Sequence, residues 1–258
     1  MTLTVDANWL LSRLEDADTV IIDCRGIMPY RFGHIKNAKP LALERVISVA
    51  ENGANLVIDA KTAEEVFSEL GIDSSKTVVL YGEFPDPSVA RIAWTLIYHG
   101  QQNVKLLEVP YSHWHKLGLP ITRQNPIRKP TAGRFVSSVN PAVRADAQMI
   151  KEKQDYGGVI IVDARTPQEH FQARIPGSIL LNWEEGLGDD GKMIKNKAEL
   201  ERVFERKRIT KDKEIICYCH SGMRASHQYL QLKQAGFSNA RMYDGSIIDW
   251  AQRRNPLR

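Results

Sequence analysis

Short apolar runs alternate with longer helical patterns along both halves of the chain. This alternation is typical of βαβ units and predicts an α/β fold, with a mainly parallel sheet flanked by helices in each half. Two helical segments, Ser88–His99 and Arg224–Ala235, stop at Gly100 and Gly236, because glycine readily takes the left-handed conformation that ends a helix. Both helices are expected to pack against their sheets. The expected strands are Thr19–Asp23, Thr77–Tyr81, Val104–Leu107, Val159–Asp163, Glu214–Tyr218 and Ala240–Tyr243.

The second half of the chain repeats the pattern of the first. Val20–Arg25 and Ile160–Arg165 are both apolar runs that end in Asp-x-Arg, and they lie 140 residues apart. Further along, Lys76–Tyr81 matches Lys213–Tyr218 at an offset of 137 residues. Because the offset drifts so little over most of a half, we infer a duplicated domain with small insertions and deletions.

The join between the two domains is predicted at Ile121–Arg134. Two prolines and a glycine interrupt regular structure there, and the segment holds basic residues but no acidic one. A chain of 258 residues is long enough for two domains of ordinary size. We therefore expect a first domain at residues 1–120, a linker at 121–134 and a second domain at 135–258.

The composition is that of an ordinary globular protein, with 43% hydrophobic and 26% charged residues. The net charge of +4 suits small anionic substrates, and without basic clusters it gives no reason to expect nucleic acid as a partner. The first 18 residues mix charged with apolar side chains, so neither a secretory signal nor a membrane span is expected. An odd count of 3 cysteines argues against a disulfide framework and fits a cytoplasmic protein.

One short segment combines the residues that nucleophilic sulfur chemistry needs. The strand that ends at Tyr218 leads into the loop Cys219–Arg224, and a helix is expected to follow at once. The start of a helix presents unpaired N–H groups and the positive end of its dipole, which stabilise an anion such as a thiolate. Cys219 is therefore the predicted nucleophile. The predicted substrate-binding loop consists of His220, Ser221, Gly222, Met223 and Arg224.

Four motifs in this order resemble those of the rhodanese family. They are the loop Cys219–Arg224, the strand end with Asp163 and Arg165, the segment Arg174–Ser178, and Asp244–Ser246. The duplication is similar to that of the tandem members, so the resemblance covers nearly the whole chain and implies two tandem rhodanese-like domains. We expect Asp163 and Arg165 to hold the active-site loop in place.

The resemblance implies transfer of a sulfane sulfur through a cysteine persulfide. The donor would be a small anion such as thiosulfate, and the acceptor cyanide or a thiol, with a thioredoxin-like protein among the candidate partners. No cofactor is expected, and no metal, because Cys217 and Cys219 lack a second ligand pair at the spacing of a zinc site.

The loop of the first domain lacks the nucleophile. Gly82 stands where the second half has Cys219, and Glu83 and Asp86 follow it. These two carboxylates would repel an anionic donor. The first domain is therefore expected to be non-catalytic.

Three alternative functions stay open. Cysteine phosphatases of related fold have one more residue between nucleophile and arginine, whereas 4 residues separate Cys219 from Arg224 here. In family members that use 3-mercaptopyruvate, the loop after the cysteine holds small neutral residues, whereas the loop of the thiosulfate type is more basic. Both loops commonly end in Thr. Because His220 and Arg224 depart from both patterns, the donor stays open, with thiosulfate preferred. The third alternative is a carrier that presents a persulfide to a partner protein.

Overall fold

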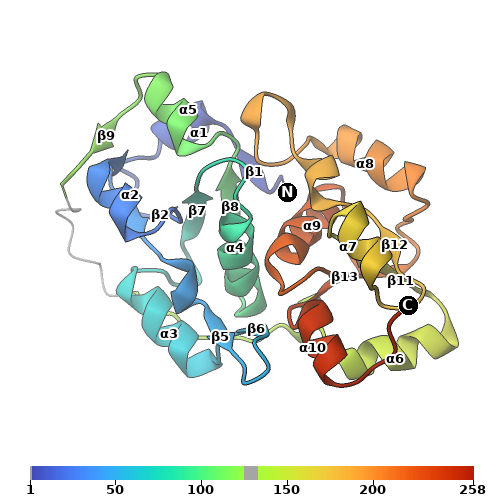
Figure 1. Cartoon of the computed structure of the whole chain (residues 1–258). Coiled ribbons are helices and arrows are strands. Elements are labelled where there is room, and N and C mark those ends of the chain that lie inside the picture. Colours follow the sequence, from blue (N-terminus) through green and yellow to red (C-terminus); the bar gives the residue numbers. More distant parts are fainter. Residues whose placement is uncertain (1, 125–132) are drawn as a thin grey trace. The chain divides into compact units, whose positions relative to one another are not determined.

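The computed structural model of the chain describes residues 2–124 and 133–258 (Figure 1). They form two compact units, and each unit includes a short segment from the other half of the sequence. The predicted domains are contiguous, whereas the two units exchange residues 48–57 and 188–194. Unit 1 comprises Met1–Ile47, Ile58–Val139 and Gly188–Ile194, and unit 2 comprises Ser48–Val57, Asn140–Leu187 and Lys195–Arg258.

The predicted linker Ile121–Arg134 is described only at its two ends. Its first residues form strand β9 (Ile121–Thr122), which pairs antiparallel with β3 (His34–Ile35) in unit 1. Residues 125–132 lie outside the described residues. Regular structure therefore continues two residues past the predicted end of the first domain.

Each unit is built on a parallel sheet of 5 strands, and the strand order is the same in both. In unit 1 the order is β1 (Thr4–Val5), β8 (Val104–Leu107), β7 (Thr77–Tyr81), β2 (Thr19–Asp23) and β4 (Lys39–Pro40). In unit 2 it is β10 (Arg144–Ala145), β14 (Ala240–Tyr243), β13 (Glu214–Tyr218), β11 (Val159–Asp163) and β12 (Ile179–Leu180). The three central strands of each sheet have the bounds that the sequence predicts.

The central strands form because their apolar side chains are covered on both faces of the sheet. Ile22 in β2 and Val162 in β11 are fully buried. The register of the two sheets is equivalent, since Asp23 lies beside Tyr81 in unit 1 and Asp163 beside Tyr218 in unit 2. The repeat in the sequence thus corresponds to a repeat in the structure.

Helices flank both sheets, as the sequence predicts (Figure 1). In unit 1 helix α4 contacts β7 and β8, and in unit 2 helix α9 contacts β13 and β14. The core of unit 1 includes Trp114, and the core of unit 2 includes Trp250 at the matching position. No helix in the described part of the chain is long and apolar enough to cross a bilayer. The helices are α1 (Ala7–Leu11), α2 (Ile27–Phe32), α3 (Ala60–Glu69), α4 (Ser88–Tyr98), α5 (Tyr111–Lys116), α6 (Ala147–Tyr156), α7 (Pro167–Gln172), α8 (Lys197–Arg206), α9 (Met223–Gln234) and α10 (Ser246–Gln252).

The exchanged segment of unit 2 is a hairpin formed by β5 (Ile47–Val49) and β6 (Asn55–Val57). Its Val57 N–H donates to Asp244 Oδ2 at 2.9 Å, and its Asn52 Nδ2 donates to Asp249 Oδ1 at 3.1 Å. Both carboxylates lie at the start of α10 or just before it. These hydrogen bonds place the hairpin with unit 2.

Candidate active site

Cys219 lies between the end of β13 and the start of α9, where the sequence places it. Its side chain is buried, and the backbone N–H of Gly222 donates to its sulfur at 3.1 Å. Gly222 has a φ of 88°, which a residue with a Cβ atom takes only with strain. Glycine at this position therefore allows the loop to fold back and direct an N–H group at the sulfur.

The first turn of α10 holds the backbone of the Cys219 loop. Ser246 Oγ accepts the N–H of Cys219 at 3.0 Å, and the N–H groups of Ile247 and Ile248 donate to the carbonyls of Cys219 and His220 at 3.2 and 3.3 Å. Ser246 also donates to the Tyr243 carbonyl at 2.8 Å. The first turn of α10 therefore holds the loop backbone in place while the Gly222 N–H donates to the cysteine sulfur.

Asp163 is the centre of a buried hydrogen-bond network at the end of β11. Its carboxylate accepts Arg165 Nε at 2.9 Å and Nη2 at 2.7 Å, the Tyr218 hydroxyl at 2.8 Å, and contacts His170 Nδ1 at 2.9 Å. Arg165 Nη2 also donates to the Ala173 carbonyl at 2.6 Å. Burial acts to raise the pKa of Asp163, but the hydrogen bonds and charge of Arg165 outweigh it, and the pKa is lowered. The network fixes Tyr218, the residue before Cys219.

The charge of Arg224 is compensated within the site, because Arg224 forms an ion pair with Glu169. Its Nη1 and Nη2 donate to the two carboxylate oxygens of Glu169 at 2.6 and 2.7 Å. Thr166 caps the start of α7 and holds the same carboxylate, since its N–H donates to Glu169 Oε2 at 3.1 Å. The hydrogen bonds from Arg224, followed by those from Thr166, lower the pKa of Glu169 to about 2. The positive charge that Arg224 brings to the Cys219 loop is thus largely compensated.

The structure brings together most of the residues that the sequence singles out, and it adds three. Met223 begins α9, Ser221 is half-buried, and His220 is exposed. Sequence reasoning named Ser246 in a family motif without giving it a place in the site, and it missed Glu169 and His170. The Thr166–Glu169 spacing of a capping box is a local signal that places Glu169 at a helix start, but not beside Arg224.

Replacing Glu169 with glutamine is expected to lower the stability of unit 2 at pH 6 by about 1 kcal/mol, allowing for the partly exposed pair. A folded pKa of about 2, below the ordinary 4.5, means that the carboxylate contributes stability above pH 4.5, and that this is lost as the pH falls toward 2. The gap between wild type and Glu169→Gln should therefore narrow from pH 6 to pH 3. Urea unfolding at both pH values measures it.

The control for that experiment is Glu205→Gln, which makes the same change of charge at an exposed position on α8. It should leave the free energy of unfolding nearly unchanged at both pH values. A gap of constant size for Glu169→Gln between pH 6 and pH 3 would contradict the assigned pairing.

Unit 1 repeats the buried network but not the nucleophile. Asp23 accepts Arg25 Nε and Nη2 at 3.0 and 2.6 Å and the Tyr81 hydroxyl at 2.6 Å. Gly82 stands at the position of Cys219, and a Cβ atom added there would lie only 2.5 Å from Val89 Cγ2. The space that a cysteine side chain would need is filled by the first turn of α4.

A rhodanese-like domain model matches residues 6–117 and 146–253, which is most of both halves. The chain belongs to the rhodanese family. The matched ranges agree with two rhodanese domains in tandem, each with its own parallel sheet. Among the described residues, no three His, Cys, Asp or Glu side chains gather as they would around a metal ion.

Relatives of this rhodanese chain carry several names. It is 30% identical over 274 residues to the sulfur carrier protein TtuD of Thermus thermophilus, with 95% of this chain and 92% of that protein covered. It is 27% identical over 262 residues to a "Putative thiosulfate sulfurtransferase" of Mycolicibacterium smegmatis, covering 95% and 93%. The crystal structure of SseA from Escherichia coli, described as a 3-mercaptopyruvate sulfotransferase, matches with a TM-score of 0.83 at 25% identity, covering 95% of this chain and 99% of SseA.

Proposed function

We propose that this chain is a sulfurtransferase that takes up a sulfane sulfur on Cys219 as a persulfide and passes it to a thiol or cyanide. The observation that carries the proposal is the Cys219 sulfur, held at 3.1 Å from the Gly222 N–H in the loop before α9. The names of the relatives support sulfur transfer in general. We assign Cys219 as the nucleophile and the loop up to Arg224 as its binding site.

The reaction proceeds in two half-reactions. The Cys219 thiolate attacks the outer sulfur of thiosulfate, a new S–S bond forms, and the old S–S bond breaks as sulfite leaves with its electron pair. The persulfide anion then rests against the N–H groups of the loop, as an oxyanion does in its hole. An acceptor thiolate or cyanide attacks the terminal sulfur, and the Cys219 thiolate is restored.

The supporting residues act by fixing the loop. In this proposal Asp163 and Arg165 hold Tyr218, and Ser246 holds the Cys219 N–H, so that the loop amides are oriented before the donor arrives. Unit 1 takes no part in the covalent step, since Gly82 offers no sulfur. All three cysteines are free, which fits a reducing compartment such as the cytoplasm.

A specific observation keeps 3-mercaptopyruvate as a second candidate donor. Glu169 compensates the charge of Arg224, so the loop is less positive than its sequence indicates. A doubly charged thiosulfate is therefore attracted to the loop less strongly. SseA adds support for this donor. With 3-mercaptopyruvate the C–S bond would break, and pyruvate would leave as its enolate and take up a proton. The likeness to TtuD leaves a carrier role as a third candidate.

The proposal is tested by loading the fully reduced protein with excess thiosulfate, removing the donor and measuring the intact mass. Wild type should gain one sulfur atom, and cyanide should remove it, whereas Cys219→Ser should gain none. A parallel reaction with 3-mercaptopyruvate at matched concentration identifies the preferred donor. Slow turnover with small acceptors but rapid transfer to one protein thiol would identify a carrier. No gain of sulfur from either donor would contradict the proposal.

A further inference from the structure

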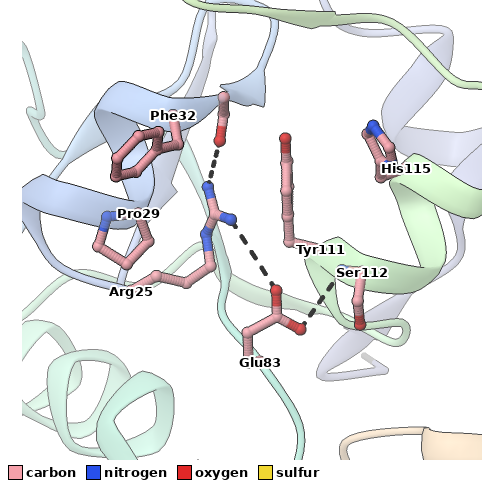
Figure 2. Close-up of a pocket in the computed structure, with 8 residues that line it drawn as sticks. Arg25, Pro29, Phe32, Glu83, Tyr111, Ser112 and His115 are labelled. Atoms are coloured by element: carbon pink, nitrogen blue, oxygen red, sulfur yellow. Dashed lines mark hydrogen bonds and ion pairs between the residues drawn. The ribbon is translucent and has the colours of Figure 1, made fainter.

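A cavity of about 460 Å³ opens in unit 1 at the carboxyl ends of β2 and β7 (Figure 2). It lies where unit 2 has its Cys219 loop, because Arg25 follows β2 and Glu83 follows β7. Its walls include Phe32 and Pro29 from α2 and Tyr111 from α5. This volume is within the range of small-molecule sites in proteins, roughly 300–1,000 Å³. The mechanism proposed above makes no use of it.

Arg25 is held so that one nitrogen of its guanidinium group stays available at the cavity. Its side chain is only 6% exposed, and its Nε and Nη2 are bound by Asp23, with Nη2 also donating to the Gly33 carbonyl at 2.7 Å. The Tyr111 ring supports the guanidinium carbon at 3.5 Å from the ring centroid. The remaining nitrogen, Nη1, is directed toward Glu83 at 3.9 Å, too far for a hydrogen bond (Figure 2).

Glu83 carries the opposite charge beside this group. Its Oε2 accepts the backbone N–H of Ser112 at 3.3 Å, and 43% of its side chain is exposed. Glu83 and Arg25 therefore place a carboxylate and a guanidinium N–H group side by side on the cavity wall, within ion-pair distance but too far apart for a direct hydrogen bond. The close approach of Tyr111 depends on Gly33, because a Cβ atom there would lie 2.8 Å from the Tyr111 hydroxyl.

The balance of charge selects the ligand. Asp23 already pairs with Arg25, so a simple anion at Arg25 Nη1 would meet the carboxylate of Glu83, and a simple cation at Glu83 would meet Arg25 Nη1, which is 3.9 Å away. A zwitterion satisfies both groups at once. We propose that unit 1 binds a free α-amino acid with an apolar or aromatic side chain, with its carboxylate on Arg25 Nη1, its ammonium group on Glu83 and its side chain against Phe32 and Pro29.

L-Phenylalanine is the probe for this proposal. Titration calorimetry with the full chain should give a Kd on the order of 1 mM, as for a small ligand held by two charged contacts. N-acetyl-L-phenylalanine lacks the ammonium group and phenethylamine lacks the carboxylate, and each should bind at least about fivefold more weakly. Binding of the acetylated compound as tightly as L-phenylalanine would overturn the proposal in favour of an anion site, and equal binding of phenethylamine in favour of a cation site.

Variants locate the binding in unit 1. Glu83→Gln keeps the contact with the Ser112 N–H and should weaken the binding of L-phenylalanine about fivefold. Glu65→Gln, an exposed position on α3, makes the same change of charge outside the cavity and should have no effect. Cys219→Ser should bind the amino acid like wild type, so this result is independent of sulfur transfer. Equal affinities of Glu83→Gln and wild type would exclude the assigned site.

Discussion

Replacing Cys219 with serine is expected to lower the rate of thiocyanate formation from thiosulfate and cyanide by about 1,000-fold or more. A serine hydroxyl is not ionised at neutral pH and cannot carry the sulfur as a persulfide. The substitution changes one buried atom, and the contact from the Gly222 N–H can pass to the serine oxygen. The measurement is the steady-state rate, with a check by circular dichroism that the fold is retained.

The other two cysteines provide the controls. Burial raises the pKa of Cys217 and of Cys24, so both remain thiols at neutral pH. Cys217 Sγ donates to the carbonyls of Ala225 and Arg241 at 3.3 and 3.2 Å, which a serine hydroxyl can replace. Cys217→Ser and Cys24→Ala should keep most of the activity. Loss of activity in Cys217→Ser, with Cys219→Ser still active, would place the nucleophile in strand β13 and contradict this proposal.

The central parts of the fold could be predicted from the sequence because they depend on local patterns. The three central strands of each sheet have the bounds that the sequence predicts, since burial on both faces requires continuous apolar residues. The edge strands β4 and β12 have only two residues each, too few for any pattern to be recognised. The exchange of residues 48–57 and 188–194 depends on contacts between distant segments, and composition does not mark it.

The candidate site divides in the same way. Cys219 and Gly222 could be predicted, because a cysteine and a glycine between a strand and a helix form a local motif. The pairing of Arg224 with Glu169 joins residues 55 apart, and the contact of Ser246 with Cys219 joins residues 27 apart. Only the packing of the helices onto the sheet brings these groups together. The sequence alone therefore does not show that Glu169 compensates the charge of Arg224.

Replacing Asp163 with alanine is expected to destabilise unit 2 by about 3–5 kcal/mol, because it leaves a buried cation without its partner. The Arg165 side chain is 5% exposed and would keep the Ala173 carbonyl as its remaining hydrogen-bond acceptor among those described above. Tyr218 would lose the Asp163 carboxylate as an acceptor and keep its contacts with the Ile175 N–H and Ser178 Oγ, so the residue before Cys219 would be held less firmly. Asp163→Asn keeps the shape and an acceptor oxygen and should cost less. Urea unfolding measures the stability, and intact mass after thiosulfate measures sulfur loading.

Unit 1 offers a matched control, because Asp23 binds Arg25 and Tyr81 in the same way. Asp23→Ala should destabilise unit 1 by a similar amount, since the Arg25 side chain is 6% exposed. The two variants should differ in chemistry: sulfur loading per folded molecule should fall in Asp163→Ala and stay near the wild-type level in Asp23→Ala, because Gly82 follows Tyr81 where Cys219 follows Tyr218. Equal losses of loading in both would show that the network acts through general stability, and not by positioning the loop.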